Sequence, residues 1–440
     1  MAVKKKKIGV GVIGFGTVGS GVIRILQENS ESIRRRLGAS LELVKVADLD
    51  IETDRGIPIE RGLLTTRADE LIDDPDVDIV VELIGGYDPA RGMILKAMEK
   101  GKAVVTANKA LLAVHGEEIY QAAQKAGVGL GFEASVGGGI PILRAIKEGL
   151  SANRIQSIYG IINGTANYIL SKMTEEKREF SDVLKEAKEK GFAEADPRFD
   201  VEGVDSAHKL AILASLAFGT PVKFEEIYTE GITEITPVDI DFATEFGYRI
   251  KLLGIAKPNN GTIEVRVHPT MIPQDYLLAT VNGVYNAVYV VGDAVGSTMF
   301  YGKGAGSLPT GSAVVSDLME VARARLLGIP IATPPAGYDP DQRPNLPLLP
   351  MDEIRSHYYL RFMALDKPGV LSRISGVLGK FDISISSVIQ KERKAEGAVP
   401  VVMMTHKARE RDVRAALDEI GGFSDIPEKT VLIRVEGEEE

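Results

Sequence analysis

The chain has 440 residues, of which 44% are hydrophobic and 26% charged, with a formal net charge of −10 and no cysteine. This length exceeds what one hydrophobic core accommodates and predicts two or three domains. The acidic balance argues against nucleic acid as a partner, because phosphate binding needs a positive surface. The lack of cysteine excludes disulfides, thiolate metal sites and cysteine nucleophiles.

No apolar run reaches the length of a membrane span, so we expect no membrane partner. The basic cluster Lys4–Lys7 is short, lacks a following apolar region with a cleavage site, and runs into a segment of strand type. We interpret it as a solvated terminus instead of a targeting signal, and we expect a cytoplasmic location.

A glycine-rich motif follows the first apolar segment of strand type, residues 8–13, and precedes a helical pattern that extends to Leu26. Strand, glycine turn and helix in this order are typical of a dinucleotide fingerprint, in which backbone N–H groups approach a pyrophosphate at the helix N-terminus. A flexible glycine loop is the alternative. The residues expected to bind the cofactor here are Gly14, Phe15, Gly16, Thr17, Val18 and Gly19.

The next expected strand, residues 41–47, ends at Asp48. A carboxylate at this position can hydrogen bond the ribose hydroxyls and favours NAD, whereas the 2′-phosphate of NADP would need a cation. Arg55 and Arg61 lie close enough downstream to supply one. The cofactor is therefore NAD or NADP, and Asp48 favours NAD.

Two further parallel strands are expected at residues 78–86 and 103–109, each preceded by a helix. The second carries Thr106, an expected cofactor contact, and ends at Lys109, on the edge where doubly wound sheets bind ligands. We therefore expect residues 1–139 to form a Rossmann-type α/β domain. Residues of about 302–328 complete it. The glycine-rich segment 301–306, with Gly302 as an expected cofactor contact, opens a long helix from about Pro309 to Leu326 and can offer a second set of N–H groups.

The segment at residues 129–141 is rich in glycine and ends the nucleotide domain. Successive glycines can expose backbone carbonyls, and Glu133 adds a carboxylate, so the loop could bind a hard cation through oxygen. A plain hinge is an equal alternative.

We predict the chemistry in residues 188–209. The first half is turn-rich and places Glu194 and Asp200 on a loop. The chain then becomes an apolar helix, on which Asp205 and Lys209 project from one face because they are four residues apart. A surface ion pair is the alternative, but the helix is too apolar for the surface, and buried charges are retained mainly when paired and often for function.

The remaining chain predicts three further parts. Residues 140–301 alternate open-sheet strands and helices, as in an α+β substrate domain whose sheet could pair across a homodimer or homotetramer. Residues 329–354 form a proline-rich linker. Residues 355–440 have the order βαββαβ, which is ferredoxin-like. Their turn at Asp366–Leu371 resembles the ligand loop of amino-acid-sensing ACT domains, with a role in oligomerisation alone as the alternative.

The segment at residues 187–209 resembles the signature of homoserine dehydrogenases, and the likeness extends over the whole chain. The matching residues are Ala187, Gly191, Phe192, Asp196, Pro197, Asp200, Gly203, Asp205 and Lys209. The resemblance implies reduction of L-aspartate 4-semialdehyde to L-homoserine by NAD(P)H, in threonine and methionine biosynthesis, with feedback by threonine at the ACT domain. No kinase-like segment precedes Lys4, so we expect the monofunctional form.

The resemblance also implies roles for single residues. Lys209 is the expected proton donor and Lys109 a second active-site lysine, while Asp200 and Asp205 position Lys209. Glu194 would hold the substrate ammonium, and Gly164, Thr165 and Phe192 would also contact the substrate. A sodium or potassium ion would be held by Glu133 and by the carbonyls of Val136, Gly138 and Ile140. The alternative function is a non-catalytic sensor of nucleotides and amino acids, for which an acid-and-lysine helix is unnecessary.

Overall fold

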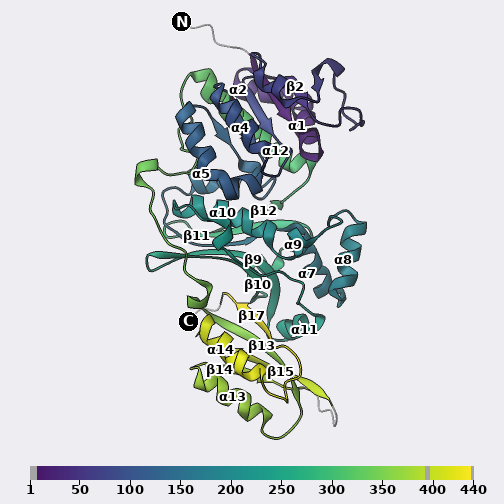
Figure 1. Cartoon of the computed structure of the whole chain (residues 1–440), viewed down its shortest axis with the longest axis vertical. Helices are drawn as coiled ribbons and strands as arrows, with labels where there is room; N and C mark the ends of the chain where they lie inside the picture. Colours follow the sequence, from purple (N-terminus) through teal and green to yellow (C-terminus); the bar gives the residue numbers. More distant parts are fainter. Residues whose placement is uncertain (1–6, 392–396, 438–440) are drawn as a thin grey trace. The chain divides into compact units, whose positions relative to one another are not determined.

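A computed structural model describes residues 7–391 and 397–437 of the chain (Figure 1). The lysines at positions 4–6 of the predicted solvated terminus lie outside these described residues. The chain divides into two compact units, and each unit draws on three separate chain segments. The first unit comprises residues 1–164, 205–227 and 285–346, and the second comprises residues 165–204, 228–284 and 347–440.

The first unit contains a six-stranded sheet in the order β3-β2-β1-β4-β5-β6, and all neighbouring strands are parallel. The strands are β1 (Lys7–Ile13), β2 (Ser40–Ala47), β3 (Leu64–Thr65), β4 (Ile79–Glu82), β5 (Ala103–Thr106) and β6 (Leu130–Gly131). Their order reverses between β1 and β4, so the ligand-binding crevice of such a sheet is expected at the carboxyl ends of these two strands.

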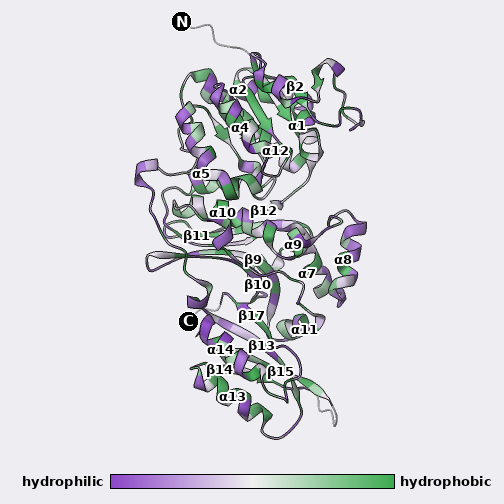
Figure 2. Ribbon diagram, in the orientation of Figure 1, coloured by the Kyte–Doolittle hydropathy of each residue, from purple (hydrophilic) through white to green (hydrophobic). Residues whose placement is uncertain are grey.

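Helices cover this sheet and close its core. They are α1 (Thr17–Glu28), α2 (Ser30–Leu37), α3 (Ala68–Asp73), α4 (Ala90–Glu99), α5 (Lys109–Ala126) and α12 (Ser307–Leu327). The last of them packs on α1, and its Val314 and Leu318 are fully buried beside Val10 and Val22. Figure 2 shows the central strands as hydrophobic, as strands covered on both faces require.

A three-stranded antiparallel set, in the order β12-β11-β7, also belongs to the first unit. It consists of β7 (Ile155–Ile161), β11 (Tyr285–Gly292) and β12 (Gly296–Lys303). The short elements of this unit are η1 (Arg61–Leu63), η2 (Glu133–Ser135), α6 (Ile142–Arg144), η3 (Ala145–Gly149), η4 (Phe224–Glu226) and η6 (Pro340–Gln342). Its most apolar helix is α10 (Val204–Phe218), which is buried along almost its whole length.

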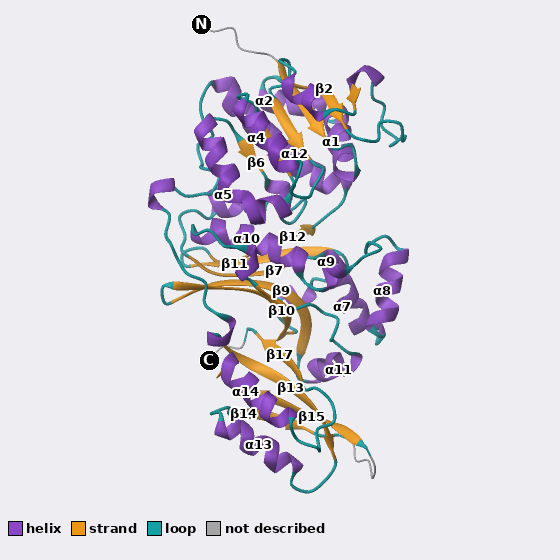
Figure 3. Cartoon of the chain, in the orientation of Figure 1, coloured by secondary structure: helices purple, strands orange, loops and turns teal. Residues whose placement is uncertain are grey.

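The second unit is built on strands in the order β9-β10-β17-β13-β15-β14, with β8 beside β10 and β16 beside β13 (Figure 3). The strands are β8 (Tyr228–Thr229), β9 (Tyr248–Asn259), β10 (Thr262–Pro273), β13 (Arg355–Leu365), β14 (Ile385–Ile389), β15 (Ala398–Thr405), β16 (Ala408–Arg409) and β17 (Val431–Val435). The helices are α7 (Gly164–Glu176), α8 (Phe180–Glu189), α9 (Arg198–Val201), α11 (Pro237–Glu245), η5 (Leu277–Thr280), η7 (Met351–Glu353), α13 (Val370–Lys380) and α14 (Glu410–Gly421).

The C-terminal part of this unit has the predicted βαββαβ order, with β16 as a short addition. Tyr358 and Phe362 of β13 pack with Ile374 and Val413 of its two helices. Its last strand, β17, pairs antiparallel with β13 and parallel with β10. The C-terminal domain therefore shares one sheet with the β9–β10 hairpin instead of standing apart from it.

The proline-rich segment, predicted as a linker at residues 329–354, is divided between the units after Leu346. Arg343 donates to Glu117 at 2.7 and 2.9 Å and to the carbonyl of Gly219 at 3.0 Å. These contacts anchor the first part of the segment to the first unit.

Buried ion pairs join the C-terminal domain to the rest of the second unit. Arg434 of β17 is fully buried and donates to Glu410 at 2.5 Å and to Glu230 at 2.9 Å. Arg266 of β10 is also buried and donates to Glu436 at 2.5 Å. Removing one partner of such a pair leaves an uncompensated charge, which costs about 3–5 kcal/mol.

No helix among the described residues is both long and apolar enough to cross a membrane.

Candidate active site

Asp205 is the centre of a buried cluster in the first unit. It lies in the first turn of α10 and is 2% exposed. Its Oδ2 accepts hydrogen bonds from Lys209 Nζ at 2.7 Å and from Asn163 Nδ2 at 2.8 Å. Lys109 Nζ, at the start of α5, lies 2.5 Å from Oδ1. One carboxylate therefore binds two ammonium groups that come from two helices.

This ion pair is buried and does not fit the surface alternative. The side chain of Lys209 is 10% exposed, whereas that of Lys109 is 35% exposed. Lys209 Nζ also donates to the carbonyl of Ile162 at 2.7 Å. With two cations against one anion, the cluster carries a net positive charge, which suits it to stabilise an oxyanion that forms beside it.

Opposing effects set the pKa of Asp205. Burial alone would raise this pKa, but the ammonium groups of Lys209 and Lys109 outweigh burial and hold the pKa well below its usual range. The carboxylate is therefore charged across the neutral range. The neighbouring His208 packs on Phe224 with ring centroids 4.1 Å apart, and burial lowers its pKa to about 4, so its ring is neutral.

The glycine motif forms the expected turn between β1 and α1. Gly14 has a φ of +104°, and a Cβ at Gly19 would overlap the carbonyl of Gly14. Gly16 occupies the N-cap position without a side-chain cap, and a Cβ there would meet nothing within 4 Å. Gly16 and Thr17 are exposed, so the uncapped N-terminus of α1 is open to solvent, which fits a bound pyrophosphate.

Asp48 is engaged by protein groups. Its Oδ2 accepts from the N–H of Phe15 at 2.5 Å, and its Oδ1 accepts from the N–H of Asp50 at 2.9 Å. The guanidinium of Arg55 lies 3.8 Å from Oδ1 and 4.8 Å from the centre of the Phe15 ring. Arg61 is exposed and pairs with Glu52 at 3.5 Å. Of the two arginines, Arg55 is the one that lies beside Asp48, just after β2.

Two other predicted cofactor contacts, Thr106 and Gly302, lie outside the turn between β1 and α1. Thr106 is fully buried, and its hydroxyl donates to Glu82 at 2.6 Å. Gly302 lies inside β12, paired with Asn286, and the helix begins only at Ser307. The predicted helix after the glycine-rich segment 301–306 is present as α12, with Gly306 at its N-cap, whereas Gly302 itself belongs to the preceding strand.

The predicted cation loop fits an ion only in part. Both carboxylate oxygens of Glu133 accept backbone N–H groups, from Leu143 and Arg144, each at 2.8 Å. The described residues hold no group of three or more His, Cys, Asp or Glu side chains placed around a metal. Gly138 has a φ of +55°, a conformation that turns the backbone sharply. An ion here would rely on the backbone carbonyls of Val136, Gly138 and Ile140.

Most predicted substrate contacts belong to the second unit. Thr165 donates to the carbonyl of Phe192 at 2.5 Å, and the Phe192 ring packs edge-on against Tyr168 with centroids 5.0 Å apart. Glu194 lies on a loop as predicted, whereas Asp200 lies in the short helix α9, because the turn after Pro197 closes into helical hydrogen bonds. Gly164 is the last residue of this part of the first unit.

The sequence prediction missed the contact of Asn163 with Asp205 and the buried position of His208 beside the cluster. Asn163 ends the segment after β7, and only the fold brings it to a residue 42 positions later. His208 stands next to Lys209 in the chain, and its place in a predicted buried helix was the available signal.

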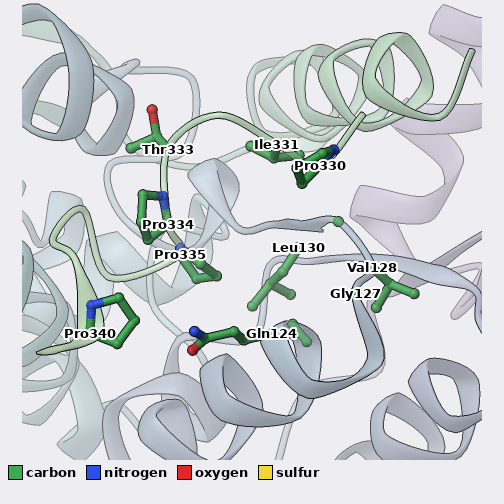
Figure 4. Close-up of a pocket in the computed structure, with 12 residues that line it drawn as sticks. Gln124, Gly127, Val128, Leu130, Pro330, Ile331, Thr333, Pro334, Pro335 and Pro340 are labelled. Atoms are coloured by element: carbon green, nitrogen blue, oxygen red, sulfur yellow. The ribbon is translucent and has the colours of Figure 1, made fainter. Parts of the chain in front are cut away.

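A cavity of about 200 Å³ in the first unit lies away from these residues (Figure 4). It is lined by the end of α5, by β6 and by the proline-rich segment, with Gln124 and Thr333 as polar lining residues. None of the Asp205 cluster lines it.

The first unit combines a parallel sheet of the nucleotide-binding type with a buried cluster of lysines and a carboxylate. The second unit ends in a βαββαβ domain. Together these features indicate an NAD(P)-dependent oxidoreductase with an added ACT domain. Family models match in the same order: the NAD-binding domain of homoserine dehydrogenase at residues 14–133, homoserine dehydrogenase at 141–319 and the ACT domain at 358–422. The chain is 49% identical to homoserine dehydrogenase of Pseudomonas aeruginosa, over 98% of this chain and 99% of that protein. It belongs to the homoserine dehydrogenase family.

Solved structures agree. The crystal structure of a homoserine dehydrogenase from Thiobacillus denitrificans matches with a TM-score of 0.93 and 49% identity, covering 98% of both chains. A hyperthermophilic archaeal homoserine dehydrogenase in complex with NADPH matches with a TM-score of 0.62 and 27% identity, covering 72% of this chain and 97% of that chain. The predicted fold class and family are confirmed.

The depressed pKa of Asp205 has a consequence for acid stability. Its ionised form contributes stability that is present above the pKa of an unfolded aspartate, about 3.9, and is lost as the pH falls through the lower folded value. Asp205→Asn removes this contribution, so its melting temperature will fall less steeply than that of the wild type between about pH 5 and pH 2. Circular dichroism melts measure this, with the exposed Asp275→Asn as control. Equal slopes for wild type and Asp205→Asn would contradict the prediction.

Proposed function

We propose that the protein reduces L-aspartate 4-semialdehyde to L-homoserine with Lys209 as the proton donor, and that threonine regulates it. The observation that carries this proposal is the buried cluster of Lys209, Asp205 and Lys109 at the start of α10. A non-catalytic sensor would not need two lysines bound to a carboxylate that burial penalises. A cytoplasmic location and a homodimer or homotetramer remain predictions.

The chain's own residues would act as follows. A bound nicotinamide supplies the hydride when the aldehyde is reduced. Lys209 donates a proton from Nζ to the aldehyde oxygen, which becomes the hydroxyl of homoserine. Asp205 holds the ammonium of Lys209 in place and stabilises its charged form, and Lys109 adds a second positive charge for the developing alkoxide. In the reverse direction a neutral Lys209 accepts the proton.

Lys209→Ala is expected to fold and to lower kcat for homoserine oxidation by roughly 10²–10⁴-fold, the range for a positioned acid or base. The assay follows the nicotinamide absorbance. The matched control is Lys125→Ala, which removes an exposed lysine from α5. If Lys209→Ala keeps the kcat of the control, Lys209 is not the proton donor.

For the cofactor, we propose that Arg55 allows NADP beside NAD. Asp48 would repel a 2′-phosphate, but the guanidinium 3.8 Å from it offsets that charge. Arg55→Ala is expected to lower kcat/KM for NADPH about tenfold more than for NADH, equivalent to about 1.4 kcal/mol. Arg61→Ala, the control, will change both alike. Equal losses with the two nucleotides in Arg55→Ala would refute a role in discrimination.

We also propose a sodium or potassium ion in the turn at residues 136–140. The two successive glycines with positive φ, Gly137 and Gly138, support carbonyl ligation, while Glu133 serves mainly to anchor α6. A bound ion stabilises the state that binds it. Melting temperatures should therefore be higher in sodium or potassium than in tetramethylammonium buffer at equal ionic strength. Identical melting curves would leave the turn as a hinge.

Threonine is the proposed effector at the turn before α13. Gly369 caps this helix with a φ of +93°, and a Cβ there would meet nothing within 4 Å, so the turn is open to a ligand carboxylate. Gly369→Asp should abolish threonine binding in calorimetry, by strain and by charge, and relieve inhibition. A truncation before residue 347 is a poor test, since β17 is also a neighbour of β10. Threonine binding that is unchanged in Gly369→Asp would exclude this turn.

A further inference from the structure

Glu82 is a fully buried carboxylate that the proposed mechanism does not use. It is the last residue of β4, and its side chain accepts hydrogen bonds from a hydroxyl and from backbone N–H groups. Oε2 accepts from the hydroxyl of Thr106 at 2.6 Å, and Oε1 accepts from the N–H groups of Ile84 at 2.9 Å and Gly85 at 3.2 Å. Every one of these partners is a donor, which suits an ionised carboxylate better than a carboxamide.

The position of Glu82 in the sheet is central. Its backbone pairs with Ile13 of β1 on one side and with Thr106 of β5 on the other. β1 leads directly into the glycine turn at Gly14, and β5 leads into α5, whose first residue is Lys109. The carboxylate of Glu82 thus lies on the strand between the one that leads into the glycine turn and the one that leads to Lys109.

Hydrogen bonds continue from Glu82 to the start of α5. The hydroxyl oxygen of Thr106 accepts from the N–H of Asn108 at 3.0 Å. Asn108 caps the helix by accepting from the N–H of Leu111 at 3.1 Å, and its amide donates to the carbonyl of Gly86 at 2.7 Å. The turn after β4 and the first turn of α5 are therefore joined twice: directly by the bond from Asn108 to Gly86, and indirectly through Thr106 and Glu82.

A carboxylate at this depth is expensive to retain. Burial raises the pKa of Glu82, and the hydrogen bonds from Thr106, Ile84 and Gly85 oppose that rise. An apolar residue would fill the space without this cost, but it would leave the hydroxyl of Thr106 and two N–H groups without their acceptor. A rigid acceptor at this point fixes the backbone from which Lys109 reaches Asp205.

We propose that Glu82 is a positioning residue that acts through Thr106 and Asn108 to hold Lys109 against Asp205. The inference rests on the proposed role of the Lys209, Asp205 and Lys109 cluster. A misplacement of a catalytic group by about 1 Å can cost 10²-fold in rate, so loss of the acceptor acts on kcat while the nucleotide is still bound.

The test compares four variants of the full-length protein. Glu82→Gln and Thr106→Val break the connection at either end, and Thr106→Ser keeps the hydroxyl. The matched control is Asp78→Asn, which changes a buried carboxylate immediately before the same strand, bonded to the N–H of Gly9 at 2.9 Å and to Arg325 at 3.1 Å. Melting temperature, kcat for homoserine oxidation and the Kd of NADPH are measured for each.

Glu82→Gln and Thr106→Val are expected to lower kcat by about 10- to 100-fold with little change in the Kd of NADPH, whereas Thr106→Ser stays near the wild type. Asp78→Asn is expected to lower the melting temperature but not kcat. If Glu82→Gln does not fold, the comparison of Thr106→Val with Thr106→Ser decides.

Three results would overturn the positioning role: an unchanged kcat in Glu82→Gln and Thr106→Val, an equal loss in Thr106→Ser and Thr106→Val, or an equal loss in Asp78→Asn. A wild-type protein that does not oxidise homoserine would instead overturn the proposed function itself.

Discussion

The negative charge of a buried carboxylate must be compensated by the protein groups around it, because water cannot reach it. In the first unit this constraint applies to Asp205. Burial penalises its charge, and only close cations and donors can restore the balance. Lys209, Lys109 and Asn163 supply them, from one turn further along α10, from the start of α5 and from the segment after β7. These three elements have to meet at one point. The packing of the first unit therefore determines whether the charge of Asp205 is compensated.

The second unit also compensates buried charges, but there the ion pairs fix the pairing of strands and not a candidate active site. Arg434 and Arg266 are among the largest fully buried side chains, and both are matched by carboxylates. Here the arginines lie in strands of one sheet, and their carboxylate partners come from α14 and from residues just beyond β8 and β17. They specify that β17 lies beside β10, since any other register would leave a buried guanidinium without its partner. A ligand that moved β13 or β17 would therefore act directly on the β9–β10 hairpin.

Local patterns in the sequence predicted much of the fold. The glycine turn, the apolar α10 with Asp205 and Lys209 on one face, and the βαββαβ order all follow from spacing and composition within short windows. What the sequence did not predict depended on distant partners. The pairing of Gly302 with Asn286, the bond from Phe15 to Asp48, and the addition of β17 to β10 involve residues that no short window contains. The contact of Asn163 with Asp205 and the buried position of Glu82 were not predicted for the same reason, because a single polar residue near a strand end has many possible roles.

The packing of α12 into the nucleotide-binding core bears on how the chain folds. Val314 and Leu318 fill a core whose other walls are formed by residues near the start of the chain. Until this helix is synthesised, roughly the first third of the polypeptide exposes an apolar surface that nothing nearby can cover. Contacts at such sequence separation must meet their loop-closure entropy before they stabilise anything. We therefore expect the first unit to fold slowly and only after α12 is synthesised. During synthesis it should depend on chaperones, which a nucleotide-binding domain built from one contiguous segment would not need.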